Sequence, residues 1–255
     1  MIIIKTPAEI EVIRECGKRL ATVLYKVKDL VKPGVSTWDL DKYAEKLIRD
    51  MGDYPAFLNY KPEGAVTPYP ASLCVSVNEE VVHGIPKKDK ILKEGDIISL
   101  DLGLNHKGFF ADMAITVPVG EVSRGTKKLL ETTEEALHIG IDAAQSGNRI
   151  GDIGHAIESF VRPHRYGIVE VLAGHGVGKA IHEDPYVPNF GKGGTGAKLQ
   201  NGMIIAIEPM LNNGTKNVVL EDDDWTFRTA DRKKSAHFAH TVLITDGEPE
   251  ILTKI

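Results

Sequence analysis

Two aspartates interrupt stretches of sequence that are otherwise suited to a protein core. Asp101 and Asp112 each lie inside an apolar run, and the segment 105–108 between the runs has the composition of a hairpin turn. If the turn centres on His106 and Lys107, the two aspartates face each other across the hairpin, with Cβ atoms about 5 Å apart. The pattern therefore predicts two carboxylates side by side in an apolar sheet.

Such a pair of like charges requires an explanation. Either one aspartate is protonated, or a cation lies between the two, or one of them points to solvent. A bulge at Gly108 would also shift the pairing by one residue. We favour the cation, because the second half of the chain supplies further groups that bind metals.

These further groups are two histidines and a glutamate. His175 lies between glycines that allow close approach of the backbone, and His182 follows seven residues later. Alone, each histidine is more typical of a surface or a satisfied core position. Glu208 ends an apolar run just before Pro209, where a carboxylate is costly unless it is paired or metal-bound. Mixed oxygen and nitrogen donors favour first-row divalent metals over calcium, and an aspartate that bridges two ions would make a two-metal site.

The spacing of apolar residues, prolines and glycines predicts the elements that carry these groups. Helices are expected over about 7–31, 37–51, 126–145 and 152–165. Strands are expected over 73–77, 97–104, 109–117, 168–172, 203–207, 218–220 and 238–244, with long functional loops at 53–72 and 183–196. Hairpins without regular βαβ alternation favour an α+β fold, and the length allows a single domain over 1–255.

Composition excludes several classes of protein. The formal net charge of −5 argues against direct recognition of nucleic acid. No apolar stretch is long enough to span a membrane, and the first residues do not form a signal peptide. Cys16 and Cys74 give no disulfide framework, which favours a reducing cytoplasm.

Six motifs, taken together in order and spacing, resemble the methionine aminopeptidases. They cover nearly the whole chain and comprise His83-Gly84-Ile85-Pro86, Asp101 with Asp112, the segment 174–178, the segment 182–185, Ile207-Glu208-Pro209 and the segment 235–241. Only 25 residues separate His182 from Glu208, which matches the short bacterial type I form. The resemblance implies a pita-bread fold, in which an antiparallel sheet of two pseudo-symmetric halves carries helices on its outer face.

The resemblance also implies five metal-ligand positions, namely Asp101, Asp112, His175, Glu208 and position 239. In the family the last is a glutamate that bridges two divalent ions, manganese, iron, cobalt or zinc. Here it is Ala239, and the neighbouring residues keep the pattern. We therefore expect weakened or partly empty metal sites and impaired activity. We favour an introduced substitution over a natural one, because the other functional positions fit an active enzyme.

The implied reaction removes the initiator methionine from nascent polypeptides by a metal-activated water. Glu208 would serve as ligand and general base, His182 would contact the substrate carbonyl oxygen, and His83 the scissile amide. The methionine pocket would include Tyr69, Cys74, Ile181 and Trp225. Asn78 and Ser235 match a monovalent-cation site of the family.

Partners and rival functions follow from the same resemblance. We expect a cytoplasmic monomer. Lys87, Lys88 and Lys90 could make transient contact with the ribosome, or they could simply belong to a solvated loop. One rival is an X-Pro peptidase of the same fold, although residues 1–72 are too few for the N-terminal domain that such enzymes usually carry. The other is a catalytically inactive pita-bread protein that uses its cleft to bind a partner.

Overall fold

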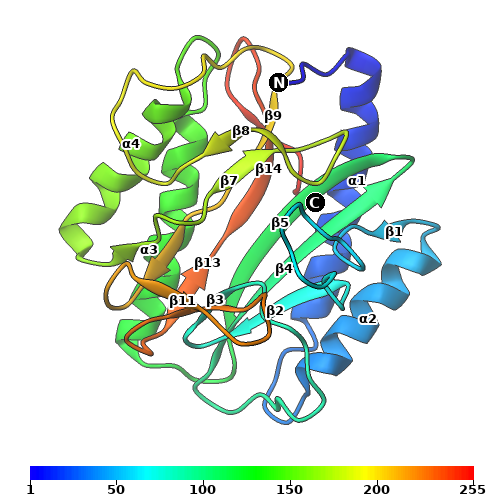
Figure 1. Cartoon of the computed structure of the whole chain (residues 1–255), viewed down its shortest axis with the longest axis vertical. Coiled ribbons are helices and arrows are strands. Elements are labelled where there is room, and N and C mark those ends of the chain that lie inside the picture. Colours follow the sequence, from blue (N-terminus) through cyan, green and yellow to red (C-terminus); the bar gives the residue numbers. More distant parts are fainter.

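A nine-stranded antiparallel sheet forms the centre of the molecule (Figure 1) in the computed structural model, which describes residues 1–255. Its strands run in the order β1-β4-β5-β14-β9-β7-β8, with β2 paired to β4 and β15 paired to β14. Their bounds are β1 (Tyr54–Pro55), β2 (Leu73–Val77), β4 (Ile97–His106), β5 (Phe109–Pro118), β7 (Gly174–Gly176), β8 (Glu183–Val187), β9 (Ile204–Ile207), β14 (Ala239–Leu243) and β15 (Glu250–Ile251). Strands distant in sequence therefore meet in one surface.

Two three-stranded sheets adjoin the large one. The first has the order β13 (Ser235–His237), β10 (Met210–Asn212) and β6 (Gly167–Ile168). The second has the order β11 (Val218–Leu220), β12 (Phe227–Thr229) and β3 (Glu80–Val82).

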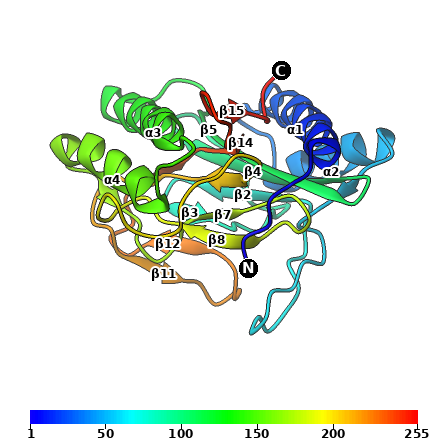
Figure 2. The same ribbon diagram turned by 90° about the horizontal axis from the view of Figure 1, so that it is seen from above.

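The helices lie on one side of the sheet, opposite β8, β11 and β12 (Figure 2). They are α1 (Pro7–Lys28), α2 (Thr37–Asp50), α3 (Arg124–Ala143) and α4 (Ile150–Val161), followed by the 3₁₀ turn η1 (Arg162–His164). The side chains of Thr6, Ser36 and Ser123 cap α1, α2 and α3 by accepting a backbone N–H. Their apolar faces and the sheet form a core of 42 buried residues. None of these helices has the length and apolar character needed to cross a membrane.

The β4–β5 hairpin forms as predicted, but its register differs from the prediction by two residues. Its turn lies at Lys107 and Gly108, which both adopt positive φ angles, 52° and 83°. Positive φ at both central residues is the geometry that two-residue hairpins need, and glycine adopts it without strain. Asp101 therefore pairs with Ala114, and the prediction that it directly faces Asp112 is wrong. Because side chains alternate between faces, the two aspartates still share one face of the sheet.

Other predicted elements differ in extent. The strands 73–77 and 218–220 and the helix near 37–51 are confirmed, whereas the first helix ends at Lys28. The predicted strand 168–172 shrinks to β6, and the predicted loop 183–196 contains β8. Pairing of β8 with the three-residue strand β7 explains the latter difference, since this contact is distant from local sequence signals.

Candidate metal centre and substrate cavity

Strand register brings Asp101, Asp112 and position 239 to the same face of the large sheet. Ala114 on β5 pairs with Asp101 on one side and with Ala239 on the other. Asp112 lies two residues before Ala114, and its backbone exchanges hydrogen bonds of 2.9 and 2.8 Å with the Thr241 hydroxyl. The side chain of Ala239, which is fully buried, therefore faces the carboxylates.

Glu208 enters the site where two chain segments leave the large sheet side by side. Pro209 cannot donate a ladder hydrogen bond, so the pairing is interrupted between the end of β9 at Ile207 and the start of β10 at Met210. Opposite it, Phe238 separates β13 from β14 and donates its N–H to the Pro209 carbonyl at 3.4 Å. This double break places the Glu208 Oε2 atom 3.6 Å from Nε2 of His237.

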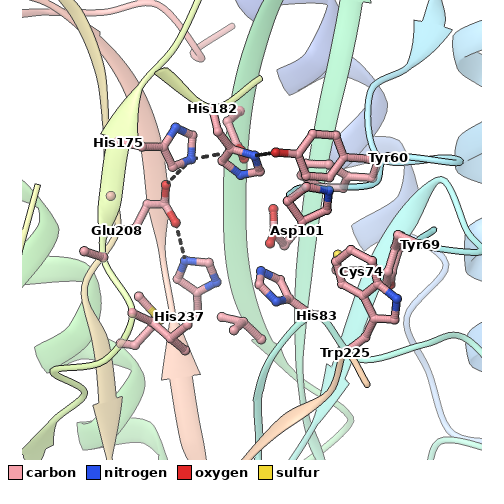
Figure 3. Close-up of a pocket in the computed structure, with 18 of the residues that line it drawn as sticks. Tyr60, Tyr69, Cys74, His83, Asp101, His175, His182, Glu208, Trp225 and His237 are labelled. Carbon is pink, nitrogen blue, oxygen red and sulfur yellow. Dashed lines mark hydrogen bonds and ion pairs between the residues drawn. The ribbon is translucent and has the colours of Figure 1, made fainter. Parts of the chain in front are cut away.

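His175 contacts two of the carboxylates through one ring nitrogen. Its Nε2 lies 3.0 Å from Oε1 of Glu208 (Figure 3). The same atom lies 3.7 Å from Oδ2 of Asp112. Its Nδ1 lies 2.8 Å from the Gly176 carbonyl, to which it donates. A second-nitrogen bond of this kind orients a histidine for metal binding.

Burial makes the charged forms of these groups energetically costly. Asp101 and Asp112 are only 8% and 4% exposed. Burial raises the pKa of Asp101 to about 6, and burial together with the Asp101 charge raises that of Asp112 well above its ordinary value. Burial opposes the charged form of His175, but the Glu208 carboxylate outweighs it and raises the pKa of His175. Without a cation the cluster must hold protons, and a divalent ion would replace them.

The residues present fit a metal centre. Ligand atoms of Asp112, His175 and His182 lie within 4.8 Å of one another, and Asp101 and Glu208 line the same cavity. Oε1 of Glu208 is buried without a hydrogen-bond donor, although it touches His175. Natural proteins rarely leave such an atom unpaired, so a cation is the expected partner. We call Asp101, Asp112, His175, Glu208 and His237 the polar wall.

Two further histidines border the cavity. Nδ1 of His182 lies 2.7 Å from the Tyr60 hydroxyl, and the rings of His182 and His175 are 4.4 Å apart between centroids. Burial, and then the charge of the nearby His175, lower the pKa of His182 to about 3. Burial lowers the pKa of His83 to about 4. Both rings are therefore neutral at pH 7.

An apolar wall, formed by Phe57, Tyr69, Cys74 and Trp225, closes the opposite side of this cavity of about 390 Å³. The rings of Tyr69 and Trp225 meet edge to face at 5.2 Å, and the Tyr69 hydroxyl donates to the Gly84 carbonyl at 2.9 Å. Ile181 packs in the same apolar cluster but does not line the cavity. The cavity thus combines a polar and an apolar wall.

Sequence reasoning gave no role to Tyr60 or His237. Both line the cavity, and Tyr60 contacts His182. The only sequence signal for His237 is its position two residues before Ala239, which puts both on one face of an extended segment.

The remaining sequence-predicted residues lie outside this cavity. The Ser235 N–H donates to the Asn78 carbonyl at 2.8 Å, so the two positions matched to a monovalent-cation site are neighbours. Nζ of Lys90 lies 2.6 Å from Glu80, and Lys88 lies over the ring of Trp38 at 5.4 Å.

Comparison with known proteins places this geometry in a family. The profile of metallopeptidase family M24 matches residues 11–246. Methionine aminopeptidase 1 of Bacillus subtilis is 45% identical over 255 residues, with full coverage of both chains. The crystal structure of methionine aminopeptidase from Thermotoga maritima superposes with a TM-score of 0.95 at 43% identity and full coverage of both chains. A prolidase from Pyrococcus furiosus shares the fold alone, with a TM-score of 0.77 at 23% identity over 99% of this chain and 66% of the prolidase. The chain has the α+β pita-bread fold and belongs to metallopeptidase family M24, among its methionine aminopeptidases.

Proposed function

We propose that this protein is a metal-dependent aminopeptidase that removes methionine from the N-termini of new polypeptides. The observation that carries the proposal is one cavity with two unlike walls. Buried carboxylates and imidazoles without adequate partners line one wall, and an apolar wall of suitable size lies opposite. Hydrolysis beside an apolar side chain needs both.

The polar wall would hold one or two divalent ions of manganese, iron, cobalt or zinc. Asp112, His175 and Glu208 would hold one ion, and Asp101 with Asp112 would contribute to the other. When bound, such ions lower the pKa of water and supply a nucleophile at neutral pH. Glu208 would accept a proton from that water, since its carboxylate remains ionised beside His175.

His182 is the residue best placed to stabilise the oxyanion that develops on the scissile carbonyl. Burial raises the pKa of Tyr60, so its hydroxyl keeps the proton and can donate to Nδ1 of His182. The neutral His182 ring then carries its own proton on Nε2, available to the substrate. His83, also neutral, would contact the scissile amide.

The apolar wall would select methionine. Tyr69, Cys74 and Trp225 offer aromatic and sulfur surfaces that suit an unbranched thioether. The ring of His83 lies 6.2 Å from that of Trp225, which joins this wall to the reacting centre.

Ala239 would weaken the metal centre. Two divalent ions carry four positive charges, whereas Asp101, Asp112 and Glu208 supply three negative ones. We expect the second ion to bind weakly and the activity to be low. Ala239→Glu should restore tight binding of two ions and strong methionine release from a Met-Ala-Ser peptide. Metal titration of the two proteins tests this expectation, and absence of a second ion in the glutamate variant would overturn the ligand assignment.

One observation, the missing carboxylate at Ala239, favours a binding protein without catalysis as the second candidate. An Ala239→Glu variant that holds two ions but cleaves neither Met-Ala nor Ala-Pro peptides, and that forms a stable peptide complex, would support it. Cleavage of Ala-Pro but not Met-Ala would support the X-Pro peptidase instead.

The proposed setting is a cytoplasmic monomer that acts on nascent chains. Cys16 and Cys74 are both free and buried, which accords with a reducing compartment. The neighbouring Asn78 and Ser235 would hold a monovalent cation.

A further inference from the structure

We propose that His237 takes the place of the missing carboxylate at position 239 and serves as a ligand of the second metal ion. Glu208 would then join Asp112 as a residue shared by the two ions. This inference rests on the proposed metal-dependent function and names the group that completes its second ion site.

The His237 imidazole is buried without a hydrogen-bond partner. Its side chain is 1% exposed, and neither ring nitrogen has a hydrogen-bond partner. Its backbone is held firmly, since its N–H and C=O both bond to the Thr116 hydroxyl, at 2.8 and 2.7 Å. Burying a polar group without a partner costs roughly 1–3 kcal/mol. A ring kept in this position at such a cost points to a ligand.

Glu208 lies between two imidazoles. Its Oε1 is 3.0 Å from Nε2 of His175, and its Oε2 is 3.6 Å from Nε2 of His237. Figure 3 shows the His175 and His237 rings on either side of this carboxylate, with Asp101 across the cavity from it. Two donors about 2.1 Å from one ion lie about 3.0 to 3.6 Å apart, depending on the angle between them. Each histidine and the nearer oxygen of Glu208 can therefore share an ion.

The contacts on the page assign one histidine and one Glu208 oxygen to each ion. His175, Asp112 and Oε1 of Glu208 would bind one ion, and His237, Oε2 of Glu208 and Asp101 would bind the other, with Asp112 between them. The exchange is not equivalent to a glutamate, because a neutral imidazole adds a ligand but no negative charge. Hence the second ion should bind through His237, yet more weakly than it would to a carboxylate at 239.

The plain alternative is that His237 is a buried histidine that only packs and contacts Glu208. Both readings require its present position, but only the first predicts that removing the ring changes binding of the second ion. Only the first also predicts that the effect disappears when position 239 carries a carboxylate.

The experiment compares four forms of the full chain, namely the parent, His237→Asn, Ala239→Glu and the double variant. Cobalt(II) is titrated into each by calorimetry, and imidazole N–H resonances shifted by bound cobalt are counted by proton NMR. In the parent we expect two such resonances, and in His237→Asn one. The dissociation constant of the second ion should rise about 10- to 100-fold in His237→Asn relative to the parent. It should change less than about threefold when the same substitution is made in the Ala239→Glu variant.

His106→Asn provides the matched control, because its ring is also buried but bonds to Asp53 at 2.7 Å, outside the polar wall. It should leave both dissociation constants unchanged, and circular dichroism should show that every variant folds. Unchanged second-ion affinity and two shifted resonances in His237→Asn would overturn the role of His237 while leaving the aminopeptidase proposal intact. Absence of any bound ion in both the parent and Ala239→Glu would overturn the proposed function itself.

Discussion

The two walls of the cavity differ in how far their own residues satisfy their buried polar atoms. The apolar wall is stable by its own contacts, and its one buried polar atom without a partner is the indole nitrogen of Trp225. The polar wall holds three such atoms, on Glu208 and His237, and two buried aspartates with raised pKa values. The apolar wall is therefore complete in the chain alone, whereas the polar wall leaves buried charges and polar atoms that a cation would balance.

Their construction differs as well. The polar wall draws on β4, β5, β7, β13 and the β9–β10 break, so sheet pairing fixes its geometry. Most of the apolar wall comes from Phe57, Tyr69 and Cys74, which lie in or beside the long segment 56–72 between β1 and β2. Substitutions in the polar wall should thus affect ion binding and rate, and those in the apolar wall substrate choice.

Among these substitutions, loss of His175 should reduce ion binding and activity the most. In the Ala239→Glu background, His175→Ala should lower methionine release from Met-Ala-Ser to less than about one-thousandth, because the ion that activates water is no longer held. Calorimetry should show loss of at least one ion. His155→Ala, on the exposed side of α4, is the control and should retain full activity. Comparable activity in both variants would contradict the assignment.

His182→Ala in the same background should cost about 10²- to 10³-fold in kcat, the usual cost of losing one oxyanion donor. The number of bound ions should stay the same, which separates this role from that of a ligand. Tyr60→Phe, which removes only the hydroxyl that orients His182, should cost less. Loss of an ion in His182→Ala would show that His182 belongs among the metal ligands.

His83, which lies between the two walls, should make the free energy of unfolding depend on pH. Its pKa is about 4 in the folded protein and about 6.5 in the unfolded chain, so the unfolded chain binds a proton first as the pH falls. The folded protein should lose between about 1 and 3 kcal/mol from this group between pH 6.5 and 4. Urea unfolding in EDTA should show His83→Asn gaining relative to the parent over that range. A constant difference between the two proteins would contradict the prediction.

The apolar wall should give the smallest effect. Trp225→Leu in the Ala239→Glu background should reduce discrimination between Met-Ala and Leu-Ala peptides by about tenfold in kcat/KM, since pocket shape alone is worth about 1–3 kcal/mol. Ion affinity should not change. A loss of bound ions instead would mean that the two walls are not independent.

Much of this site could be predicted because its acidic residues are unusual where they stand. Asp101, Asp112 and Glu208 interrupt or end apolar strands, so their chemistry was visible without coordinates. The hairpin register was missed because it depends on the positive φ of Lys107, which a lysine does not signal. Strands β7 and β8 were missed because long-range pairing holds them. The environment of His237 was not predictable, since only the fold shows that its ring has no partner.

Anomalous diffraction from crystals of the parent protein grown with manganese(II) would show whether the polar wall binds metal ions. We expect a strong peak in contact with Asp112, His175 and Glu208, and a weaker peak on the side of Asp101 and His237. Crystals that hold manganese only at the protein surface, with this cavity free of any peak, would contradict this expectation.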